Sequence, residues 1–277
     1  MSGVRVMAGI TLREAMRRKI LWTALAAGAL MLVIFAVALK FQVLEFQGRA
    51  MSPFLRYQVE AGMLMIGLYT CDLVAVVMAI VMSIDTLAGE IGSGTIHAIA
   101  TKPIARWQIF LGKFLGFAGM VTAYVALTFT ATIAVAWWVT GVMPEHPMSG
   151  FLLIDFECLI ALSVSFLLGT WVSTLTNGAL VLGLQGLAFM GGWLEQVSGF
   201  SLSPQVVTVG VVSSLIMPGE SLWRRAAFEM QTPLAGSLSF SPFANVSIPS
   251  MTAVGYAGVF LIVVLAAGMY RFQKRDL

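Results

Sequence analysis

The chain has 277 residues, of which 59% are hydrophobic and 10% are charged, and its mean hydropathy is +0.92. A soluble domain carries about 25% charged and about 45–50% apolar residues. A water-soluble fold of this size cannot hide so many apolar side chains, because part of every globule faces solvent. The composition therefore excludes a soluble protein and indicates a protein that lies in a lipid bilayer.

The net charge of +3 and the pI near 9.0 do not indicate a nucleic-acid-binding protein. In membrane proteins the excess of Lys and Arg collects in cytoplasmic loops. Cys71 and Cys158 both fall in apolar stretches, without a CxxC pair or a histidine cluster nearby. They are therefore expected to be small buried hydrophobic residues, and we expect neither a metal site nor a cofactor in this chain.

Six apolar segments are long enough to cross a membrane. A spanning helix needs about 20 mostly apolar residues, because about 30 Å of hydrocarbon is crossed at about 1.5 Å per residue. This pattern predicts an all-α polytopic membrane protein whose residues 1–277 form a single transmembrane domain. The predicted spans are residues 20–39, 62–84, 114–139, 155–175, 178–198 and 251–270.

A long segment, residues 199–250, separates the fifth and sixth predicted spans and contains five prolines. Inside it, the apolar run from Gln205 to Met217 has only about 13 residues, which is too short to cross a bilayer. We expect a half-inserted helix there, followed by a short amphipathic helix from Glu220 to Met230.

The distribution of basic residues predicts the orientation of the six spans, because cytoplasmic loops are enriched in Lys and Arg. With the N-terminus inside, the cytoplasmic side carries Arg5, Arg13, Arg17, Arg18, Lys19, Lys102, Arg106, Lys113, Arg271, Lys274 and Arg275. The outer side carries Lys40, Arg49, Arg56, Arg224 and Arg225. Both termini are therefore predicted to be cytoplasmic. Residues 1–19 would form a cytoplasmic N-terminal helix, and residues 199–250 would be extracytoplasmic.

The stretch between the second and third predicted spans, residues 85–113, is expected to form a substantial cytoplasmic element. Gly89, Gly92 and Gly94 permit a tight turn directly under the membrane. Ser93 or Thr95 can cap a short helix, and Pro103 would end that helix because the residue before a proline is pushed out of the α region.

The aromatic pair Trp137 and Trp138 locates the ends of the third predicted span. Tryptophan is enriched at membrane interfaces, so this pair is expected at the outer one. Counting back about 20 residues places the inner boundary near Phe117. Lys113 would then lie about one turn inside the cytoplasm, where its ammonium group can reach water.

In their order and spacing, these residues resemble the permeases of the type-2 ATP-binding-cassette (ABC) exporter family. That family shows an acidic residue after its second helix, then Gly-Thr, a short helix, a proline, a basic residue and a Gly-Lys pair. The matching positions here are Glu90, Gly94, Thr95, Pro103, Arg106, Gly112 and Lys113. The stretch 11–18 is similar to that family's basic N-terminal helix, with its Arg-Glu step at Arg13 and Glu14. Within the family, the chain is most similar to short permeases of multicopper-enzyme maturation.

The resemblance implies a bacterial inner-membrane half-exporter, in which two copies form the translocation path within the membrane lipid. Separate ATPase subunits would bind ATP and Mg²⁺, and the helix after Glu90 would dock on them. The chain itself would not be an enzyme, and its sequence contains no G-x-x-x-x-G-K-[ST] phosphate loop. The residues that the resemblance assigns to ATPase coupling are Glu14, Asp85, Glu90, Gly94, Thr95, Pro103, Arg106 and Lys113.

Asp72 is the acidic residue closest to the middle of a predicted span. An ionisable group at that depth is costly, which makes it a candidate functional residue. It could line the translocation path beside Tyr69, or it could fix helix packing through a hydrogen bond to Ser or Thr on a neighbouring helix. Asp155, Glu157 and Glu195 lie near predicted outer ends, so they are expected at the membrane interface.

Two other functions are compatible with parts of the sequence. A transporter driven by an ion gradient would use intramembrane ionisable groups, of which Asp72 is the main candidate. Alternatively, the complex could transmit ATP-driven motion to an extracytoplasmic partner through residues 199–250. A membrane-embedded enzyme is not favoured, because no HExxH motif occurs and no histidine lies inside a predicted span.

Overall fold

The computed structural model describes residues 3–17, 19–47, 52–92, 105–201, 204–231 and 248–274. Within those residues the chain forms nine helices and no strand. The helices are α1 (Gly3–Arg17), α2 (Lys19–Gln47), α3 (Pro53–Gly92), α5 (Arg106–Thr140), α6 (Pro147–Gly169), α7 (Thr174–Ser201), α8 (Pro204–Ile216), α9 (Gly219–Met230) and α10 (Met251–Lys274). The predicted all-α fold is therefore confirmed.

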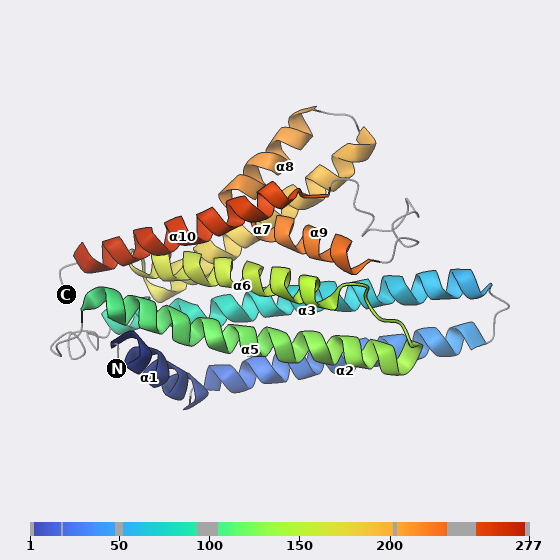
Figure 1. Cartoon of the computed structure of the whole chain (residues 1–277), viewed down its shortest axis with the longest axis horizontal. Helices are drawn as coiled ribbons and strands as arrows, with labels where there is room; N and C mark the ends of the chain where they lie inside the picture. The colour runs from blue at the N-terminus through green and yellow to red at the C-terminus, as the bar shows by residue number, and fades with distance from the viewer. Residues whose placement is uncertain are drawn as a thin grey trace.

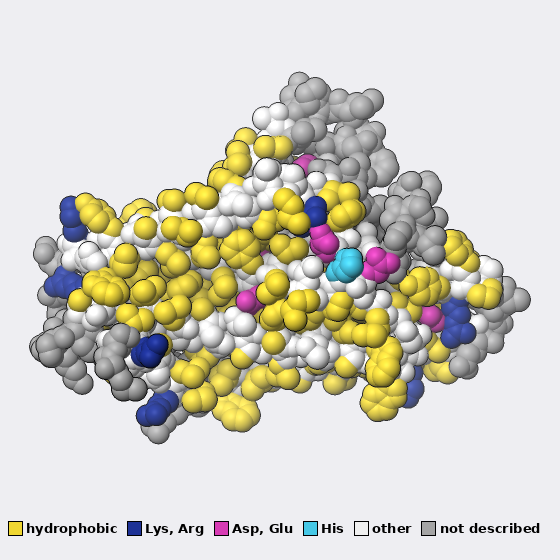
Figure 2. All heavy atoms as spheres, viewed as in Figure 1, with side chains coloured by type: hydrophobic (Ala, Val, Ile, Leu, Met, Phe, Trp, Pro, Cys, Tyr) yellow, Lys and Arg dark blue, Asp and Glu magenta, His cyan; other side chains and the backbone are white. Residues whose placement is uncertain are grey.

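Six of these helices, α2, α3, α5, α6, α7 and α10, are long and apolar enough to cross a membrane. The protein is therefore a multi-pass membrane protein, as predicted. Figure 1 shows that the two ends of the chain lie at the same end of the bundle, which we call the termini end; the opposite end is the far end. Apolar side chains cover much of the face in Figure 2, and most of the visible Lys and Arg side chains lie towards the two ends.

Several helices extend beyond their predicted apolar cores. Helix α3 has 40 residues, which corresponds to about 60 Å, or about twice the thickness of the hydrocarbon core. It continues through Asp85 and Gly89 to Gly92, so the tight turn predicted at Gly89 is wrong. The described parts of the predicted cytoplasmic element 85–113 are thus the end of α3 and the beginning of α5.

The fourth span was predicted at residues 155–175, and this prediction is wrong by about one third of its length. Helix α6 begins at Pro147 and ends at Gly169. Proline suits the first helical turn, because its missing N–H group would have no helical partner there. A short turn at residues 170–173 then leads into α7.

The interior of the bundle lies around α3 and α6, whereas α2 and α10 are peripheral. In the most apolar part of each helix, 61% of α6 and 56% of α3 is buried, against 22% of α2 and 17% of α10. In a membrane protein such exposed apolar surface is covered by lipid or by another subunit. Helices α2 and α10 therefore present the chain's main exposed apolar faces.

The two short helices expected between the last two spans are confirmed as α8 and α9. Helix α8 packs on α7, where two glycines allow close approach: a Cβ atom added to Gly191 would collide with Ser213, and one added to Gly210 would lie 2.9 Å from the carbonyl of Gly191. Helix α9 does not lie on the surface but packs against α6 in the bundle, and Arg224 on it is only 2% exposed. The amphipathic sequence of α9 therefore reflects packing of the helix within the bundle and not a position at the membrane surface.

Candidate functional site

The termini end brings together helix ends that are distant in the sequence. It contains the beginnings of α1 and α5, the ends of α3 and α10, and the turn between α6 and α7 (Figure 1). Trp138, near the far end of α5, is 89% exposed, as expected of an interfacial tryptophan. Placing Trp137 and Trp138 at one interface puts the other about 20 residues earlier, near Phe117. Residues 106–116 of α5 then extend beyond the hydrocarbon at the termini end.

The residues predicted to couple to an ATPase are distributed over several of these helix ends. Asp85 lies on α3, Arg106 and Lys113 lie on α5, and Glu14 lies exposed on α1. For Glu90 the structure describes only the helical backbone. The predicted positions outside the described residues are Gly94, Thr95 and Pro103.

Two glycines of α5 form a close contact surface for α1, which we call the glycine seat. A Cβ atom added to Gly112 would lie 2.5 Å from Cβ of Met7 and 2.9 Å from the carbonyl of Val4. One added to Gly116 would lie 2.9 Å from Cβ of Thr11. The Gly-x-x-x-Gly spacing places both glycines on one face of α5, where they let two helix backbones approach closely. Helix α1 is therefore fixed to α5 along a short, tightly packed line.

Lys113, between the two glycines of the seat, is only 3% exposed. It was expected to reach water at the headgroup level, so its burial corrects that prediction. Its neighbours in the chain, Gly112 and Phe114, are buried as well, so this turn of α5 is enclosed within the bundle. Lys113 therefore does not project freely towards a partner.

The end of α3 is tied to the turn between α6 and α7 by side-chain hydrogen bonds. Thr174 Oγ1 donates to Asp85 Oδ1 at 3.2 Å. Asn177, fully buried, donates through Nδ2 to the carbonyls of Ile84 at 3.3 Å and Ser165 at 3.1 Å. The Ser83 hydroxyl donates to Ser165 Oγ at 2.8 Å. These bonds fix the end of α3 relative to α6 and α7.

The beginning of α5 is also tied to the end of α10. Arg106 Nη1 donates to the backbone carbonyl of Gln273 at 3.1 Å. One turn further along α5, Phe110 packs edge-on against Phe166 of α6 at 5.7 Å between ring centroids and against Phe272 of α10 at 5.9 Å. The aromatic contacts make this junction a continuous apolar core. Arg106, predicted to couple to the ATPase, therefore also holds the C-terminal helix in place.

A second polar region lies inside the bundle and is built from three helices. Asp72 of α3, Glu157 of α6 and Glu220 of α9 are 2%, 1% and 6% exposed and lie close enough to interact electrostatically; we call them the acidic cluster. Gln185 Nε2 of α7 donates to Glu157 Oε1 at 2.6 Å, and the backbone N–H of Trp223 donates to the same carboxyl group. Among the described residues, Asp72 Oδ1 and Glu157 Oε2 have no hydrogen-bond partner.

The acidic cluster was only partly predicted. Asp72 was correctly expected at the middle of a span, where it is buried, but its neighbours are carboxyl groups and not a packing Ser or Thr. Glu157 and Asp155 were expected at the membrane interface; both are buried, and Glu157 is the eleventh of the 23 residues of α6. The error follows from the misplaced start of the fourth span. A helix beginning at Pro147 carries Glu157 to its centre.

Arg224 of α9 is the basic residue beside the acidic cluster. Its Nη2 atom pairs with Glu195 Oε2 of α7 at 2.8 Å, and the arginine side chain is 2% exposed. Arg224 also attracts the Glu220 carboxylate, but burial and the nearby Glu157 outweigh this attraction and raise the pKa of Glu220 well above its ordinary value of 4.5. Folding therefore makes the Glu220 carboxyl group harder to ionise than it is in the unfolded chain.

Tyr69, one turn before Asp72 on α3, contacts an aromatic group beside the acidic cluster. Its ring lies 5.0 Å from that of Trp223 on α9 and 6.4 Å from that of Phe189 on α7. The two residues predicted for the translocation path, Tyr69 and Asp72, are thus both on the side of α3 that faces α9.

Among the described residues, no group of three or more His, Cys, Asp and Glu side chains could hold a metal ion.

Comparison with known proteins agrees with this architecture. Residues 5–277 match the family described as ABC-2 family transporter protein. No curated protein gives a significant match. The match covers nearly the whole chain, including α1 with its glycine seat, all six spans and the acidic cluster. The chain therefore belongs to the ABC-2 transporter family and is the membrane-spanning permease component of an ABC transporter.

Proposed function

We propose that this permease is half of an exporter: two copies form the translocation path, and separate ABC ATPase subunits drive it from the termini end. The observation that supports this proposal is the convergence of α1, α3, α5 and α10 at that end. A subunit that docks there contacts the ends of several helices at once. Its motion would therefore move the bundle and not a single loop.

The glycine seat provides the route for this motion. Closure of the ATPase pair on ATP binding would push α1 and the segment between α3 and α5. Because Gly112 and Gly116 hold α1 against α5 without intervening side chains, a displacement of α1 is passed to α5. The Asp85–Thr174 bond and the Arg106–Gln273 bond would pass it on to α7 and α10. The path would then open alternately to the two sides, or its contents would be expelled laterally.

The orientation that goes with this function places the termini end in the cytoplasm of a bacterial inner membrane. Eleven Lys and Arg residues fall on the side of the termini by sequence, against five on the other side, as the positive-inside rule requires. ATP and Mg²⁺ would be bound by the partner ATPase.

The acidic cluster supports a second candidate function, transport driven by an ion gradient. Buried ionisable groups near the middle of a bundle are the usual sites of proton or cation coupling in such transporters. Asp72 and Glu157 each lie near the middle of a spanning helix and satisfy this description. A third function, transmission of ATP-driven motion to an extracytoplasmic partner, would use residues 199–250, which include α8 and α9.

The decisive experiment is affinity purification of the tagged permease in mild detergent, followed by mass spectrometry and an ATPase assay. Recovery of an ABC ATPase near one-to-one, with hydrolysis, is expected. Recovery of the permease alone, together with uptake or efflux driven by a pH gradient in proteoliposomes, would overturn the ATP-driven proposal in favour of the second candidate.

The same preparation tests the predicted coupling residue Glu90. Replacing Glu90 with Ala should lower the amount of bound ATPase or its stimulated activity, without changing insertion into the membrane. Glu145→Ala is the matched control, because Glu145 is an exposed glutamate between α5 and α6 at the far end. Equal ATPase binding and activity in the two variants would contradict the assignment of Glu90.

A further inference from the structure

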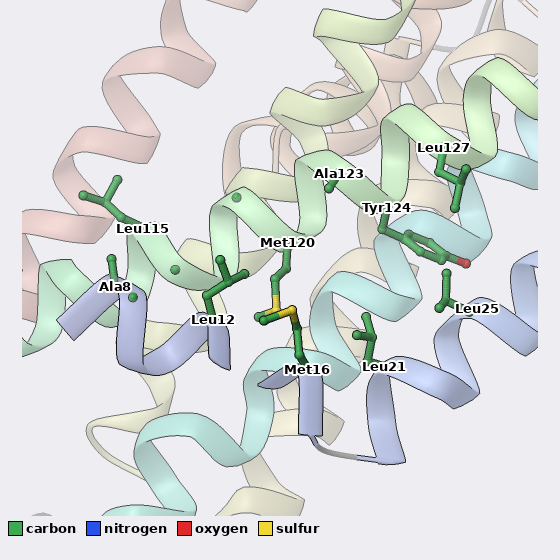
Figure 3. A pocket seen from close by; sticks show the side chains of 13 residues that line it. Ala8, Leu12, Met16, Leu21, Leu25, Leu115, Met120, Ala123, Tyr124 and Leu127 are labelled. Atoms are coloured by element: carbon green, nitrogen blue, oxygen red, sulfur yellow. The ribbon is translucent and has the colours of Figure 1, made fainter. Parts of the chain in front are cut away.

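A groove with a volume of about 550 Å³ lies between α1, α2 and α5. Its walls are formed by Leu12 and Met16 of α1, Leu21 of α2, and Leu115 and Leu127 of α5, among others (Figure 3). Leu12, Met16, Leu115 and Leu127 are between 39% and 57% exposed. The groove is thus open to the surroundings of the bundle.

Glycines keep this groove open. A Cβ atom added to Gly9 or Gly119, which both line it, would meet no other atom within 4 Å. Gly119 lies one turn beyond Gly116 of the glycine seat on the same side of α5, at a point that α1 no longer covers. The missing side chains at Gly9 and Gly119 therefore create space for something other than this subunit.

The chemistry of the walls excludes a polar occupant. Every lining side chain is apolar except that of Tyr124. Its hydroxyl group already donates a hydrogen bond to the carbonyl of Ala24 at 3.1 Å. No wall group therefore offers an unmet hydrogen bond to water or to a polar ligand, and an aliphatic chain is the occupant that fits.

The groove lies at the depth of one bilayer leaflet. With one interface near Phe117, the wall residues of α5 from Gly119 onward lie within the membrane, and the deepest, Leu127, lies about 15 Å from that interface at about 1.5 Å per residue. Half of the hydrocarbon core is also about 15 Å thick. The groove therefore covers the depth of an acyl chain in the leaflet on the side of the termini.

The segment that supplies the α1 wall of the groove is basic in sequence. Residues 1–19 contain five Lys and Arg residues and one acidic residue, Glu14, a net charge of +4. Arg13 directly follows the wall residue Leu12 and is exposed. In the sequence, three more basic residues follow at positions 17–19, between the wall residues Met16 and Leu21, and their side chains lie outside the described part of the chain. Basic residues at an interface attract anionic lipid headgroups.

We propose that this groove binds one anionic phospholipid, with its phosphate beside Arg13 and one acyl chain along Leu21, Ala123 and Leu127. The lipid completes the packing of α1 onto the bundle beside the glycine seat. It also places the N-terminal helix under the influence of the membrane's lipid composition. This inference does not depend on the ATPase or on the transported substrate.

The test is photolabelling of the full chain in nanodiscs, with phosphatidylglycerol or phosphatidylcholine that carries a diazirine in its acyl chain. We expect adducts concentrated in residues 8–25 and 115–127, above the level on the lipid-facing surface of α10. Phosphatidylglycerol should label this site more strongly. Arg13→Gln should reduce its preference over phosphatidylcholine by about fivefold, since each basic residue near a membrane surface contributes about 1 kcal/mol.

Filling the groove gives the sharper comparison. Gly119→Leu should reduce groove labelling by either lipid to the level of α10, whereas Gly255→Leu on α10 should not; neither added side chain meets an atom within 4 Å at its Cβ. Equal labelling of the groove and α10, equal labelling by the two lipids, or unchanged labelling of Gly119→Leu would overturn the proposal. If Gly119→Leu fails to fold, competition by unlabelled phosphatidylglycerol on the unmodified chain decides in the same way.

A second copy of the chain is the other possible occupant. Cys71 and Cys158 are fully buried, so a Gly119→Cys variant carries a single accessible thiol among the described residues. A disulfide-linked dimer formed through this thiol in nanodiscs would overturn the lipid assignment, and its absence together with lipid adducts would support it.

Discussion

The termini end and the acidic cluster use polar side chains in opposite ways. At the termini end, neutral groups such as Asn177 and Thr174 join helix ends, and glycines bring α1 and α5 together. In the acidic cluster, three carboxyl groups are buried together, and the buried guanidinium of Arg224 beside Glu220 pairs with a fourth carboxylate, that of Glu195. The first arrangement fixes the helices. The second keeps costly groups inside the bundle, where a change of protonation or of packing alters the energy most.

The largest expected effect comes from removing the cation beside the acidic cluster. Arg224→Met leaves Glu195 without its partner and removes the attraction that favours ionised Glu220. Breaking a buried ion pair costs about 3–5 kcal/mol; we expect about 3 kcal/mol in the free energy of unfolding, since Glu195 is 16% exposed. Thermal unfolding in detergent measures the loss.

The neighbouring arginine is the matched control for this prediction. Arg225 pairs with Glu229 on the same helix, and both side chains are partly exposed, 16% and 20%. A pair between residues i and i+4 of one helix contributes about 0.2–0.5 kcal/mol, so Arg225→Met should change the melting temperature much less. Equal losses in the two variants would show that the acidic cluster needs no buried cation.

Adding even a methyl group to the glycine seat should destabilise the packing of α1 on α5. In Gly112→Ala the new methyl group lies 2.5 Å from Met7 Cβ and 2.9 Å from the carbonyl of Val4, so α1 must shift. Overpacking of this kind costs about 1–3 kcal/mol. We expect a lower melting temperature and faster proteolysis within α1. Gly119→Ala, on the same helix with open space at its Cβ, should cause neither change; matching behaviour of the two variants would rule out the seat.

The elements of the fold were readily predicted from hydropathy, and their ends were not. Apolar runs identify six spans and the short α8 and α9, because lipid requires about 20 apolar residues per crossing. Helix α3 continues through the polar residues from Asp85 to Gly92 since no proline breaks it there, and a hydropathy window does not register this. The Gly112-x-x-x-Gly116 spacing is visible in the sequence and could have predicted the seat.

The acidic cluster could be predicted only in part, for a different reason. Asp72 stands out because it lies in the middle of an apolar run, whereas Glu157 was assigned to a helix end. The signal that corrects this is Pro147, which favours a helix start there. Glu220 lies 148 residues after Asp72 in the sequence, and no local pattern brings α9 between α6 and α7. Tertiary packing alone creates the cluster.

The acidic cluster, unlike the termini end, should make the stability of the protein depend on pH through Glu220. Because burial raises the pKa of Glu220 above 4.5, the folded protein keeps this proton at pH values where the unfolded chain has released it. Its favourable contribution is complete below about pH 4.5 and is lost as the pH rises towards the folded-state pKa. Glu220→Gln should therefore raise the melting temperature at pH 8 and leave it nearly unchanged at pH 4.5. Glu157 and Arg224 remain in place in this variant, so an equal shift at both pH values would exclude ionisation of Glu220 as its cause.

The smallest effect should come from the hydrogen bond that ties α3 to α7. Thr174→Val removes the donor to Asp85 while preserving the shape of the side chain, and a net loss of about 0.5–1.5 kcal/mol is typical of such a bond. Thr176→Val is its control, because the bond of Thr176 to Ser173 is exposed and water replaces it. Stability of the permease alone should thus differ little between the two variants. If the termini end transmits motion as a fixed unit, the ATPase activity of the assembled transporter should fall in Thr174→Val and not in Thr176→Val. The reason is that the bond between Thr174 and Asp85 joins α7 to α3, whereas the bond of Thr176 does not. Unchanged activity in both variants would mean that the bonds of Asn177 are sufficient to hold α3 and α7 together. Because Asn177 also bonds to Ser165, motion would then pass between these helices through α6.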